Sequence, residues 1–363
     1  MKIAILGNLT PGYICPMTQG LERMLRELRA HPTVFPLSLN LLSHSAGIKG
    51  SLKHIFFRPY MSRLAEFDAI IVVQHLRDAF TTALAIETLR LLVPDTPVLL
   101  YDLTYLPTVG RWGPWLKSAG NELWGSGSQT FRGLKRYDWY LCVSKQNRLP
   151  MPAEEQPCSE IGIYLDDDSL YPAPKSSFRA LIDFEREAFP GERKLQFEAL
   201  KETDTDYVVL QGQYPISAIR EIYRTCSIYF LAHMESFGLP ICELQACGSR
   251  IMTPYADWCD AHRLPDASLG SHHRLPPNFV IYDNHKETLI HEIQRVKEKA
   301  DPKAVAESFR RHHGHFLTGN PDALQDVLDR ISRKEITAQS HQEYTGRTEQ
   351  IPIRPDNTNK HQQ

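Results

Sequence analysis

The chain has 363 residues, 42% of them apolar and 23% charged, and this composition excludes disordered, fibrous and collagen-like proteins. One hydrophobic core rarely serves a chain of this length, so two domains of about 150 residues each are expected. The net charge of −2 conceals a basic first half, because residues 1–150 hold 17 Lys and Arg against 10 Asp and Glu, and such a half suits an anionic partner.

The N-terminus, MKIAILGN, carries an apolar run that is too short for a signal peptide. No uncharged apolar run reaches the roughly 18 residues that a membrane span needs. Seven cysteines occur without CxxC spacing, and Cys142, Cys226 and Cys242 stand in apolar surroundings. This pattern favours buried reduced thiols over disulfides. We therefore expect a cytoplasmic protein without a membrane span or an export signal.

Four apolar runs in the first half are continuous rather than alternating, which is typical of strands buried on both faces of a parallel sheet. They are KIAILG (2–7), DAIIVV (68–73), PVLLYD (97–102) and DWYLCVS (138–144). The segment QGLERMLRELRAHP follows the first run, with apolar residues at i, i+3, i+4 and i+7 from Leu21 and a stop at His31 and Pro32. Alternation of strand and helix predicts an α/β domain.

A Pro- and acid-rich stretch at residues 149–177 interrupts this pattern, which then resumes. Four further strands are expected at ALIDF (180–184), DYVVLQG (206–212), CSIYFLA (226–232) and SRIMTP (249–254), with helical segments between and after them. We predict domains at residues 1–172 and 173–310, a C-terminal helix at 311–333 that returns toward the first domain, and a disordered tail at 334–363.

The segment ESFGLPICELQACG, residues 235–248, follows a predicted buried strand and opens a short helix. Pro240 suits the first turn of this helix, and Gly248 suits the residue just after its end. The helix start then lies at the carboxyl edge of the sheet, where open α/β domains bind ligands. Free N–H groups at a helix start attract phosphate.

Two carboxylates flank this loop, Glu235 at the strand end and Glu243 in the expected first helical turn. A carboxylate repels phosphate but accepts hydrogen bonds from vicinal hydroxyls. A ligand with diols on both sides of a diphosphate satisfies all of these groups, and a nucleotide sugar has that layout. The alternatives are a helix-stabilising role for Glu243 and a solvated loop position for Glu235.

The same segment resembles ExFGxxxxExxAxGxP, the E-x7-E signature of retaining GT-B glycosyltransferases of the glycosyltransferase group 1 family. The stretches YPISAIREIYRTCSIYFLAH, DWYLCVSK and IGIYLDDDSLYPAP also resemble that family, as do TQGLERMLREL and TPVLLYDLTYL more weakly. The resemblance implies a GT-B architecture, in which two Rossmann-like domains present parallel sheets to an interdomain cleft. It also implies sugar transfer from a UDP- or GDP-sugar with retention of configuration, with no metal or other cofactor required.

By this resemblance, Glu243 binds the ribose hydroxyls of the donor and Glu235 holds hydroxyls of the transferred sugar. The backbone N–H groups of Phe237, Gly238 and Leu239 face the sugar and the diphosphate. No protein nucleophile is implied. The departing diphosphate is the group that takes the acceptor proton.

The chain departs from the family in the basic residues that neutralise the diphosphate. The family carries GR...KG after the first strand of the second domain, where this chain reads IDFEREAFPGERK. Arg186 is the candidate for the arginine, and Arg193 or Lys194 for the lysine, with Lys194 preferred. A solvated helix start is an equal alternative for the last two.

In the first domain, Tyr101 stands where the family has the histidine of an HD pair, while Asp102 is kept. His75, just after an apolar strand, is the candidate to contact the sugar or the acceptor hydroxyl instead, and a structural role is its alternative. Gly12, after the first strand, and Gly20, before the first helix, are expected to line the cleft. Glycine there lets the backbone approach a phosphate or an acceptor, although an ordinary turn also explains it.

Basic and aromatic residues concentrate in the first domain, in SLKHIFFRPYMSRL, RWGPWLKSAGNELWGSG and FRGLKR. Core packing of these aromatics is the favoured interpretation, and peripheral contact with an anionic membrane or a polyanion is the alternative. The acceptor stays open among glycans, lipid-linked acceptors, proteins, metabolites and nucleic acids. A non-catalytic GT-B protein that binds a nucleotide or glycan, or a phosphorylase- or epimerase-like enzyme, also fits, but the E-x7-E loop favours a transferase.

Overall fold

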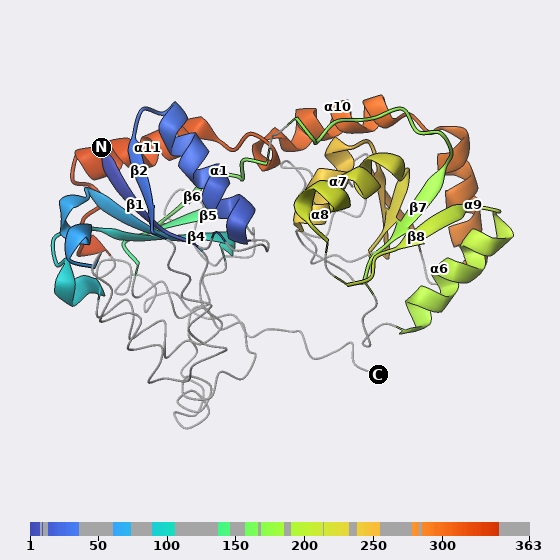
Figure 1. Cartoon of the computed structure of the whole chain (residues 1–363), viewed down its shortest axis with the longest axis horizontal. Coiled ribbons are helices and arrows are strands. Elements are labelled where there is room, and N and C mark those ends of the chain that lie inside the picture. The colour runs from blue at the N-terminus through green and yellow to red at the C-terminus, as the bar shows by residue number, and fades with distance from the viewer. Residues whose placement is uncertain are drawn as a thin grey trace, which may run out of the picture. The chain divides into compact units, whose positions relative to one another are not determined.

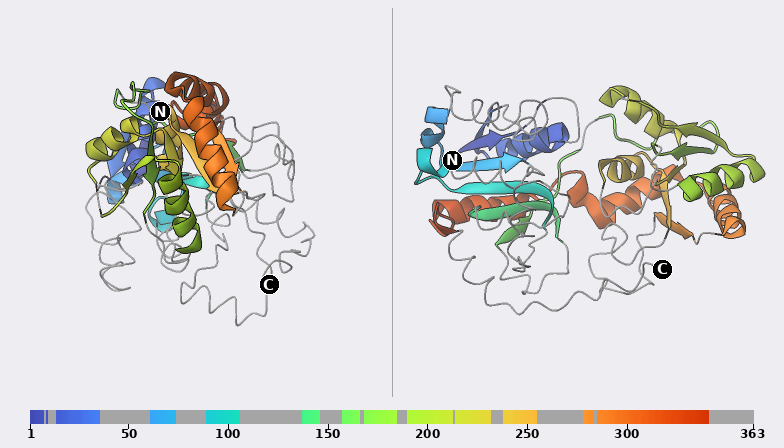
Figure 2. Two further views of the ribbon diagram at one scale, coloured as in Figure 1. Left: turned by 90° about the vertical axis from the view of Figure 1, so that its right-hand side faces the viewer. Right: turned by 90° about the horizontal axis from the view of Figure 1, so that it is seen from below.

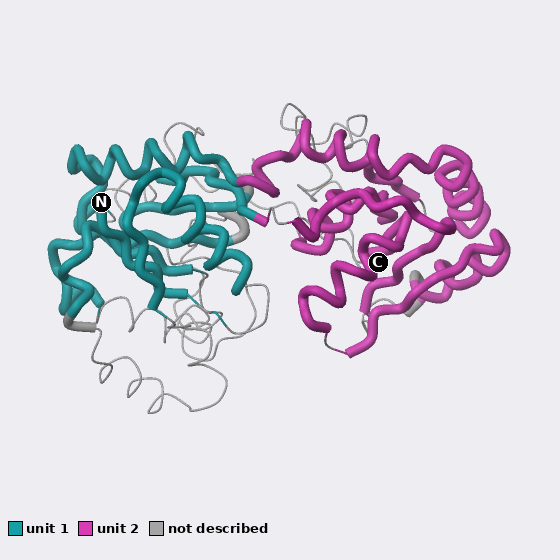
Figure 3. The backbone as a smooth tube through the Cα atoms, turned by 45° about the horizontal axis from the view of Figure 1, so that its top comes forward, with its two compact units in different colours: residues 1–164, 319–363 teal, residues 165–318 magenta. Residues whose placement is uncertain are grey.

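The computed structural model describes residues 1–7, 9, 14–35, 61–73, 89–105, 137–145, 157–165, 168–184, 190–212, 214–231, 238–254, 278–282 and 285–340. The chain forms two compact units, with residues 1–164 and 319–363 in unit 1 and residues 165–318 in unit 2 (Figure 3). The sequence predicts the first boundary after residue 172 and the return at residue 311.

Paired backbone segments explain where the chain leaves and re-enters unit 1. Within unit 1, Gly319 N donates to Ile163 O at 3.1 Å and Asn320 N donates to Ile161 O at 2.7 Å. At the beginning and end of unit 2, Leu165 N donates to Leu317 O at 2.7 Å. These bonds lie between residues distant in sequence, which is why local composition places the boundaries differently.

Unit 1 contains a six-stranded, wholly parallel sheet with the order β2-β1-β3-β4-β5-β6. Its strands are β1 (Lys2–Leu6), β2 (His31–Phe35), β3 (Ala69–Val73), β4 (Val98–Tyr105), β5 (Trp139–Lys145) and β6 (Cys158–Glu160). The four predicted apolar runs form β1, β3, β4 and β5, and β3 is buried along its whole length. The predicted α/β class with parallel strands is confirmed.

Helices cover one face of this sheet, and side chains of the other face form a buried apolar cluster with a short helix. Helices α1 (Ile14–Glu27) and α11 (Pro321–Ser332) lie along the first face (Figure 1). On the opposite face, η1 (Met61–Glu66) contributes Leu64 to a buried cluster with strand residues. That cluster includes Ala4, Leu6, Phe35, Phe67, Ile70, Val72, Leu100 and Tyr140.

Two strands of unit 1 and the start of its first helix differ from the prediction. β2 occupies HPTVF, where we expected only a helix stop, and β6 lies inside the Pro- and acid-rich stretch. Pairing with β1 and β5 outweighs the weak local signal of these short segments. α1 begins at Ile14, because Pro16 is tolerated in a first helical turn. Gly20 is therefore inside the helix rather than before it.

The first part of the predicted disordered tail packs against unit 1. Ile336, Ala338 and Ser340 are buried. Arg90 Nη1 donates to Ala338 O at 2.8 Å, while its Nη2 lies 3.1 Å from the buried carboxylate of Asp138. The segment is thus ordered to residue 340, and the remainder of the predicted tail lies outside the described residues.

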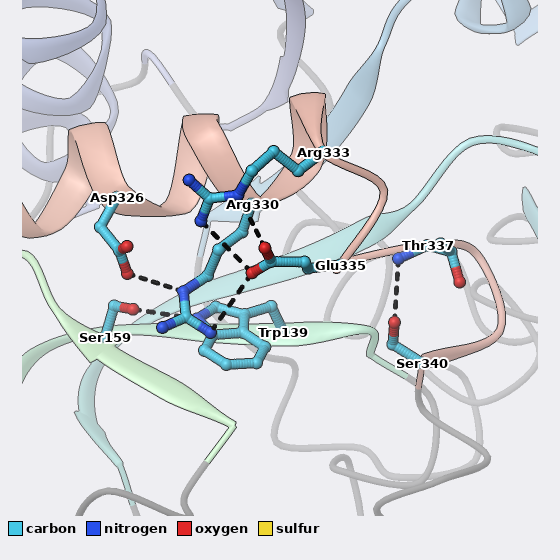
Figure 4. A network of polar contacts seen from close by, with 8 residues as sticks. All are labelled: Trp139, Ser159, Asp326, Arg330, Arg333, Glu335, Thr337 and Ser340. Atoms are coloured by element: carbon cyan, nitrogen blue, oxygen red, sulfur yellow. Dashed lines mark hydrogen bonds and ion pairs between the residues drawn. The ribbon is translucent and has the colours of Figure 1, made fainter.

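A polar network fastens the returning helix α11 to the edge of the unit 1 sheet (Figure 4). The guanidinium of Arg330 lies over the Trp139 ring, 5.4 Å from its centroid, and its Nε donates to Asp326 at 2.7 Å. Trp139 Nε1 donates to Ser159 Oγ at 3.0 Å, which joins β5 to β6. Arg330 and Asp326 are four residues apart on α11 and partly exposed, so their ion pair adds little stability, and the contact of Arg330 with Trp139 is the one that joins the helix to the sheet.

Unit 2 contains a five-stranded parallel sheet with the order β11-β10-β9-β7-β8. Its strands are β7 (Arg179–Ile182), β8 (Asp206–Val209), β9 (Ile228–Phe230), β10 (Arg250–Pro254) and β11 (Phe279–Tyr282). The first four coincide with predicted strands, and β11 is additional. Its FVIY run is only four residues long, so the apolar pattern alone gives little signal.

Helices cover both faces of this sheet (Figure 1 and Figure 2). α6 (Pro190–Glu202) and α9 (Lys286–Glu298) pack together on one face, over Ala180, Ile182, Phe230 and Met252. α7 (Ile216–Thr225) and α8 (Leu239–Ala246) lie on the other, and α10 (Pro302–His313) packs on α8. The short helix η5 (Gly314–Phe316) follows α10.

The cysteines of both units are free thiols in the described part of the chain. Cys142, Cys226 and Cys242 are buried, as predicted. Cys142 and Cys158 lie on neighbouring strands with their sulfur atoms 3.4 Å apart. None of the described helices is long and apolar enough to cross a lipid bilayer.

Gly248, which ends the α8 turn, has a backbone φ of +83°. A Cβ at this position would lie 2.6 Å from Pro302 O and 2.8 Å from its Cα, at the start of α10. We predict that Gly248→Ala lowers the free energy of unfolding by about 2 kcal/mol or more, from both the left-handed backbone and the clash. Urea unfolding of the variant and of wild type measures this difference in free energy. Gly191→Ala is the control, since a Cβ there meets nothing within 4 Å; equal losses for both variants would contradict the packing described.

His313 and His315, near the end of unit 2, predict a loss of stability in acid. The pKa of both imidazoles is lowered to about 4, by burial for His315 and by burial together with the neighbouring His315 and His312 for His313. In the unfolded chain both titrate near pH 6.5, so the unfolded state binds more protons between pH 6.5 and 4. Stability should therefore fall as the pH drops through this window.

Unfolding midpoints measured from pH 7.5 to 4.5 check this expectation. The variant His313→Leu/His315→Leu should show a shallower decline than wild type. His291→Leu is the control, because that side chain is 72% exposed and should leave the decline unchanged. Parallel curves for all three proteins would refute the assignment.

Candidate functional site

The strand order of unit 2 marks one position on the sheet as a ligand site. β7 leads through α6 to β8 on one side, and β8 leads through α7 back to β9 on the other side of β7. Open α/β sheets bind ligands at such a switch point, beside the carboxyl ends of the two diverging strands. In unit 2 these ends are Asp183 and Phe184 after β7, and Leu231 after β9, from which the chain leads to α8.

The start of α8 presents backbone N–H groups at this edge. Gly238 is the N-cap in an extended conformation, with no side chain to accept from the helix start. The first helical bond runs from Cys242 N to Gly238 O at 3.3 Å. The N–H groups of Leu239 and Ile241 thus have no acceptor within the helix, and Pro240 has no N–H. This geometry is suited to a phosphate, as the sequence predicts for Gly238 and Leu239.

Glu243 lies at the start of the second turn of α8, just past the turn in which the sequence predicts it. It is the fifth residue of the helix rather than part of its first turn, and it is 8% exposed. Its Oε1 accepts from Arg220 Nη2 at 2.7 Å and from Arg220 Nε at 3.1 Å. A helix-dipole role explains this position poorly, because that effect is confined to the first turn.

Arg220 connects Glu243 to the segment that enters unit 2. Its Nη1 donates to Ser169 Oγ at 2.9 Å, and the arginine itself is only 6% exposed. Tyr223, one turn along α7, is also buried, and burial together with the charges of Glu243 and Asp183 raises its pKa well above the ordinary value. The tyrosine therefore stays protonated, and its hydroxyl keeps the capacity to donate a hydrogen bond.

Lys175 binds the C-terminal ends of α7 and α8, the two helices that carry Arg220 and Glu243. Its Nζ donates to Cys247 O at 3.2 Å, to Arg224 O at 3.3 Å and to Cys226 O. A cation at two helix C-termini complements their dipoles. Burial lowers the pKa of Lys175 to about 8. The lysine thereby fixes α7 and α8 side by side.

The two basic residues considered for the diphosphate lie differently on α6. Arg193 is 8% exposed, and its Nη2 donates to Asp183 O at 2.9 Å, at the carboxyl end of β7. Its Nη1 donates at 2.6 Å to Gln196, which in turn donates to Leu231 O beyond β9. Lys194, the preferred candidate, has an 80% exposed side chain and pairs with Glu198 at 3.9 Å. Of the two, Arg193 is the one at the switch point.

Two candidate residues of unit 1, Gly20 and Asp102, lie in the described part of the chain. A Cβ on Gly20 would lie 2.5 Å from Tyr164 O, so this glycine admits the backbone of a neighbouring segment. Tyr101 is fully buried and donates to Gly162 O at 2.8 Å. Asp102 is half-buried on β4, one strand away from the switch point between β1 and β3.

Several predicted site residues lie outside the described part of the chain: Glu235, Phe237, Arg186, His75 and Gly12. Among the others, the structure brings Gly238, Leu239 and Glu243 together on α8. Arg220 and Ser169 were not predicted. A signal for Arg220 exists, since Ile216, Ile219, Arg220 and Tyr223 occupy i, i+3, i+4 and i+7 and place an arginine in the apolar stripe of α7. Within the described residues, no group of three His, Cys, Asp or Glu side chains could hold a metal ion.

Comparison with known proteins gives matches among solved structures, but none among family models or curated proteins. No protein-family model matches the chain. No curated protein matches it either.

Solved structures of glycosyltransferases superpose on nearly the whole chain. An alpha-glucosyltransferase (AGT) in complex with UDP has a TM-score of 0.54 at 11% identity, over 92% of this chain and 100% of that one. The alpha-glucosyltransferase with UDP and a 13-mer DNA containing an HMU base gives 0.52 at 12% identity, over 92% and 99%. The catalytic domain of starch synthase IV from Arabidopsis thaliana, bound to ADP and acarbose, gives 0.56 at 9% identity, over 92% and 98%. The two parallel α/β units and this likeness show that the chain has the GT-B fold of glycosyltransferases.

Proposed function

We propose that the protein transfers a sugar from a nucleoside diphosphate sugar to a hydroxyl acceptor, with retention of configuration. The observation that carries this proposal is the buried carboxylate of Glu243 on α8, next to the start of a helix without a capping side chain at a sheet switch point. The GT-B fold and the E-x7-E resemblance of the same segment support it. Structural neighbours that bind UDP or ADP support a nucleotide donor.

Each part of the donor has a candidate partner in unit 2. The N–H groups at the start of α8 would hold the diphosphate, and Glu243 would accept hydrogen bonds from the ribose diol. Arg193, rather than Lys194, is the basic residue whose position suits the phosphates. Glu235 would hold the transferred sugar. Stabilising the diphosphate as its negative charge develops would then be the main contribution to catalysis, and no metal is required.

The acceptor is proposed only as a hydroxyl compound that unit 1 receives. Residues 1–150 carry the excess of basic residues, which suits an anionic acceptor. One neighbour was crystallised with DNA and another with acarbose, so a polyanion and a glycan are both reasonable first candidates.

A non-catalytic nucleotide-binding protein is the second candidate, and one observation favours it. Among the described residues, Arg193 donates to the backbone carbonyls of Asp183 and Phe184 and Lys194 pairs with Glu198 at the surface, so both candidates for stabilising the leaving group already have protein partners. A transferase should release nucleoside diphosphate slowly from its donor even without an acceptor, whereas a binding protein should not.

Nucleotide binding should stabilise the protein through Glu243. At 100 times its Kd, UDP, GDP or ADP should add about 2.7 kcal/mol to the unfolding free energy, measured as a rise in the thermal midpoint. Glu243→Gln should weaken the binding of the preferred nucleotide about 10- to 100-fold, because charged hydrogen bonds to the diol are lost.

Glu221→Gln is the matched control, since Glu221 lies on α7 and its side chain is 69% exposed. It should bind nucleotide as wild type does. A wild-type protein that no nucleotide stabilises, or a Glu243→Gln variant with unchanged affinity, would contradict the proposed site.

Glu235→Ala should separate sugar positioning from nucleotide affinity. If Glu235 holds the transferred sugar, its loss should slow the release of nucleoside diphosphate from the sugar donor by about 10-fold or more, with little change in the Kd for the nucleotide alone. Steady-state kinetics and calorimetry give the two quantities. Turnover equal to wild type would refute this role.

A further inference from the structure

We propose that Arg220 is a positioning residue for the donor, which fixes the Glu243 carboxylate for the ribose diol. This inference rests on the proposed function, because it names how the nucleotide site is held in its binding geometry. Nothing in the E-x7-E resemblance assigns this arginine, which lies on α7 rather than in the loop or on α8.

The contacts between Arg220 and Glu243 hold the carboxylate in one position. Arg220 Nη2 and Nε both donate to one oxygen of Glu243, Oε1, at 2.7 and 3.1 Å. Its Nη1 donates to Ser169 Oγ at 2.9 Å, so the guanidinium itself is held from a second side. A planar guanidinium with three N–H groups engaged cannot rotate without breaking several bonds. The Glu243 side chain is thereby restricted to one rotamer before any ligand arrives.

Packing alone does not explain why an arginine occupies this place. Arg220 is 6% exposed, whereas Ile216, on the same stripe of α7, is 42% exposed. On this stripe the helix therefore buries an arginine and exposes an isoleucine. Replacing a buried ion pair by apolar residues of similar volume is often neutral or favourable for stability. Stability is thus a weak reason for this pair, and positioning a carboxylate is a stronger one.

Pre-organisation has a measurable consequence for affinity. A carboxylate already held in its binding geometry loses little conformational entropy when a diol binds, so more of the hydrogen-bond energy appears as affinity. The effect should be specific for the hydroxyls that Glu243 contacts. Loss of Arg220 should therefore weaken a nucleotide that has the ribose diol more than one that lacks it.

The test compares UDP with 2′,3′-dideoxy-UDP, and ADP with 2′,3′-dideoxy-ADP, by calorimetry on the full chain. Wild type should bind the ribose form of its preferred nucleotide about 10-fold or more tightly than the dideoxy form. Glu243→Gln should remove most of this preference. Arg220→Met should reduce it to a similar extent, and Arg220→Lys should restore only part of it, because an ammonium cannot bond Glu243 and Ser169 in the same way.

Two further variants distinguish a loss of positioning from a loss of folding. Ser169→Ala removes the hydrogen bond that Arg220 makes outside the pair and should lower the diol preference about two- to fivefold, as a partial release of Arg220. Arg224→Met is the matched control, since Arg224 lies on the same helix and donates to the backbone of Ser169 at 2.6 Å without a bond to Glu243. It should keep the wild-type preference.

The outcomes separate this inference from the proposed function. If Glu243→Gln loses the preference but Arg220→Met and Ser169→Ala keep it, Arg220 is only structural or contacts the phosphates, and the inference is overturned while the nucleotide site stands. If wild type shows no preference for the ribose form, the role of Glu243 fails and this inference fails with it.

Discussion

The carboxylate of Glu243 lies almost entirely out of water, and a charge in such a place requires a partner. Arg220 is that partner, and the pair requires α7 and α8 to lie side by side at a fixed distance. Lys175 meets this requirement at their C-terminal ends, where it bonds carbonyls of both helix termini. Gly248 allows the tight turn between α8 and β10, and its lack of a Cβ lets Pro302 at the start of α10 lie against it. The neighbourhood of α8 is thus organised around one buried charge.

The topology supplies the second condition for a site. The order of the unit 2 sheet reverses between β7 and β9, and α8 begins beside that reversal. Helix N–H groups and a buried carboxylate are then available along one helix, about one turn apart. The first suits phosphate and the second suits hydroxyls, which together describe a nucleotide more closely than either group alone.

Much of the fold is predictable from the sequence because its strands are continuous apolar runs between turn residues. The bounds of α7 and α8 follow from Pro215, Pro240 and Gly248, whose effects are local. β2, β6 and the ordering of residues 334–340 were not predicted, since they depend on partners far away in the sequence. Gly20 lies inside α1 and not before it, because the helix begins at Ile14 and accommodates Pro16 in its first turn.

The site shows the same division between local and long-range information. The loop at 235–248 carries the positions of Gly238, Leu239 and Glu243 in its own pattern. Arg220 is 23 residues from Glu243, and an arginine on a surface helix normally indicates a solvated side chain. Only its place in the apolar stripe of α7 signals burial. Its partner becomes evident once the two helices are seen together.

The most direct test of the account is a crystal structure of the protein with UDP or ADP bound. We predict a diphosphate at the start of α8 and ribose hydroxyls within about 3 Å of the Glu243 carboxylate, with Arg220 still bonded to it. A nucleotide bound at another edge of either sheet, or a ribose that does not reach Glu243 in the occupied site, would contradict the account.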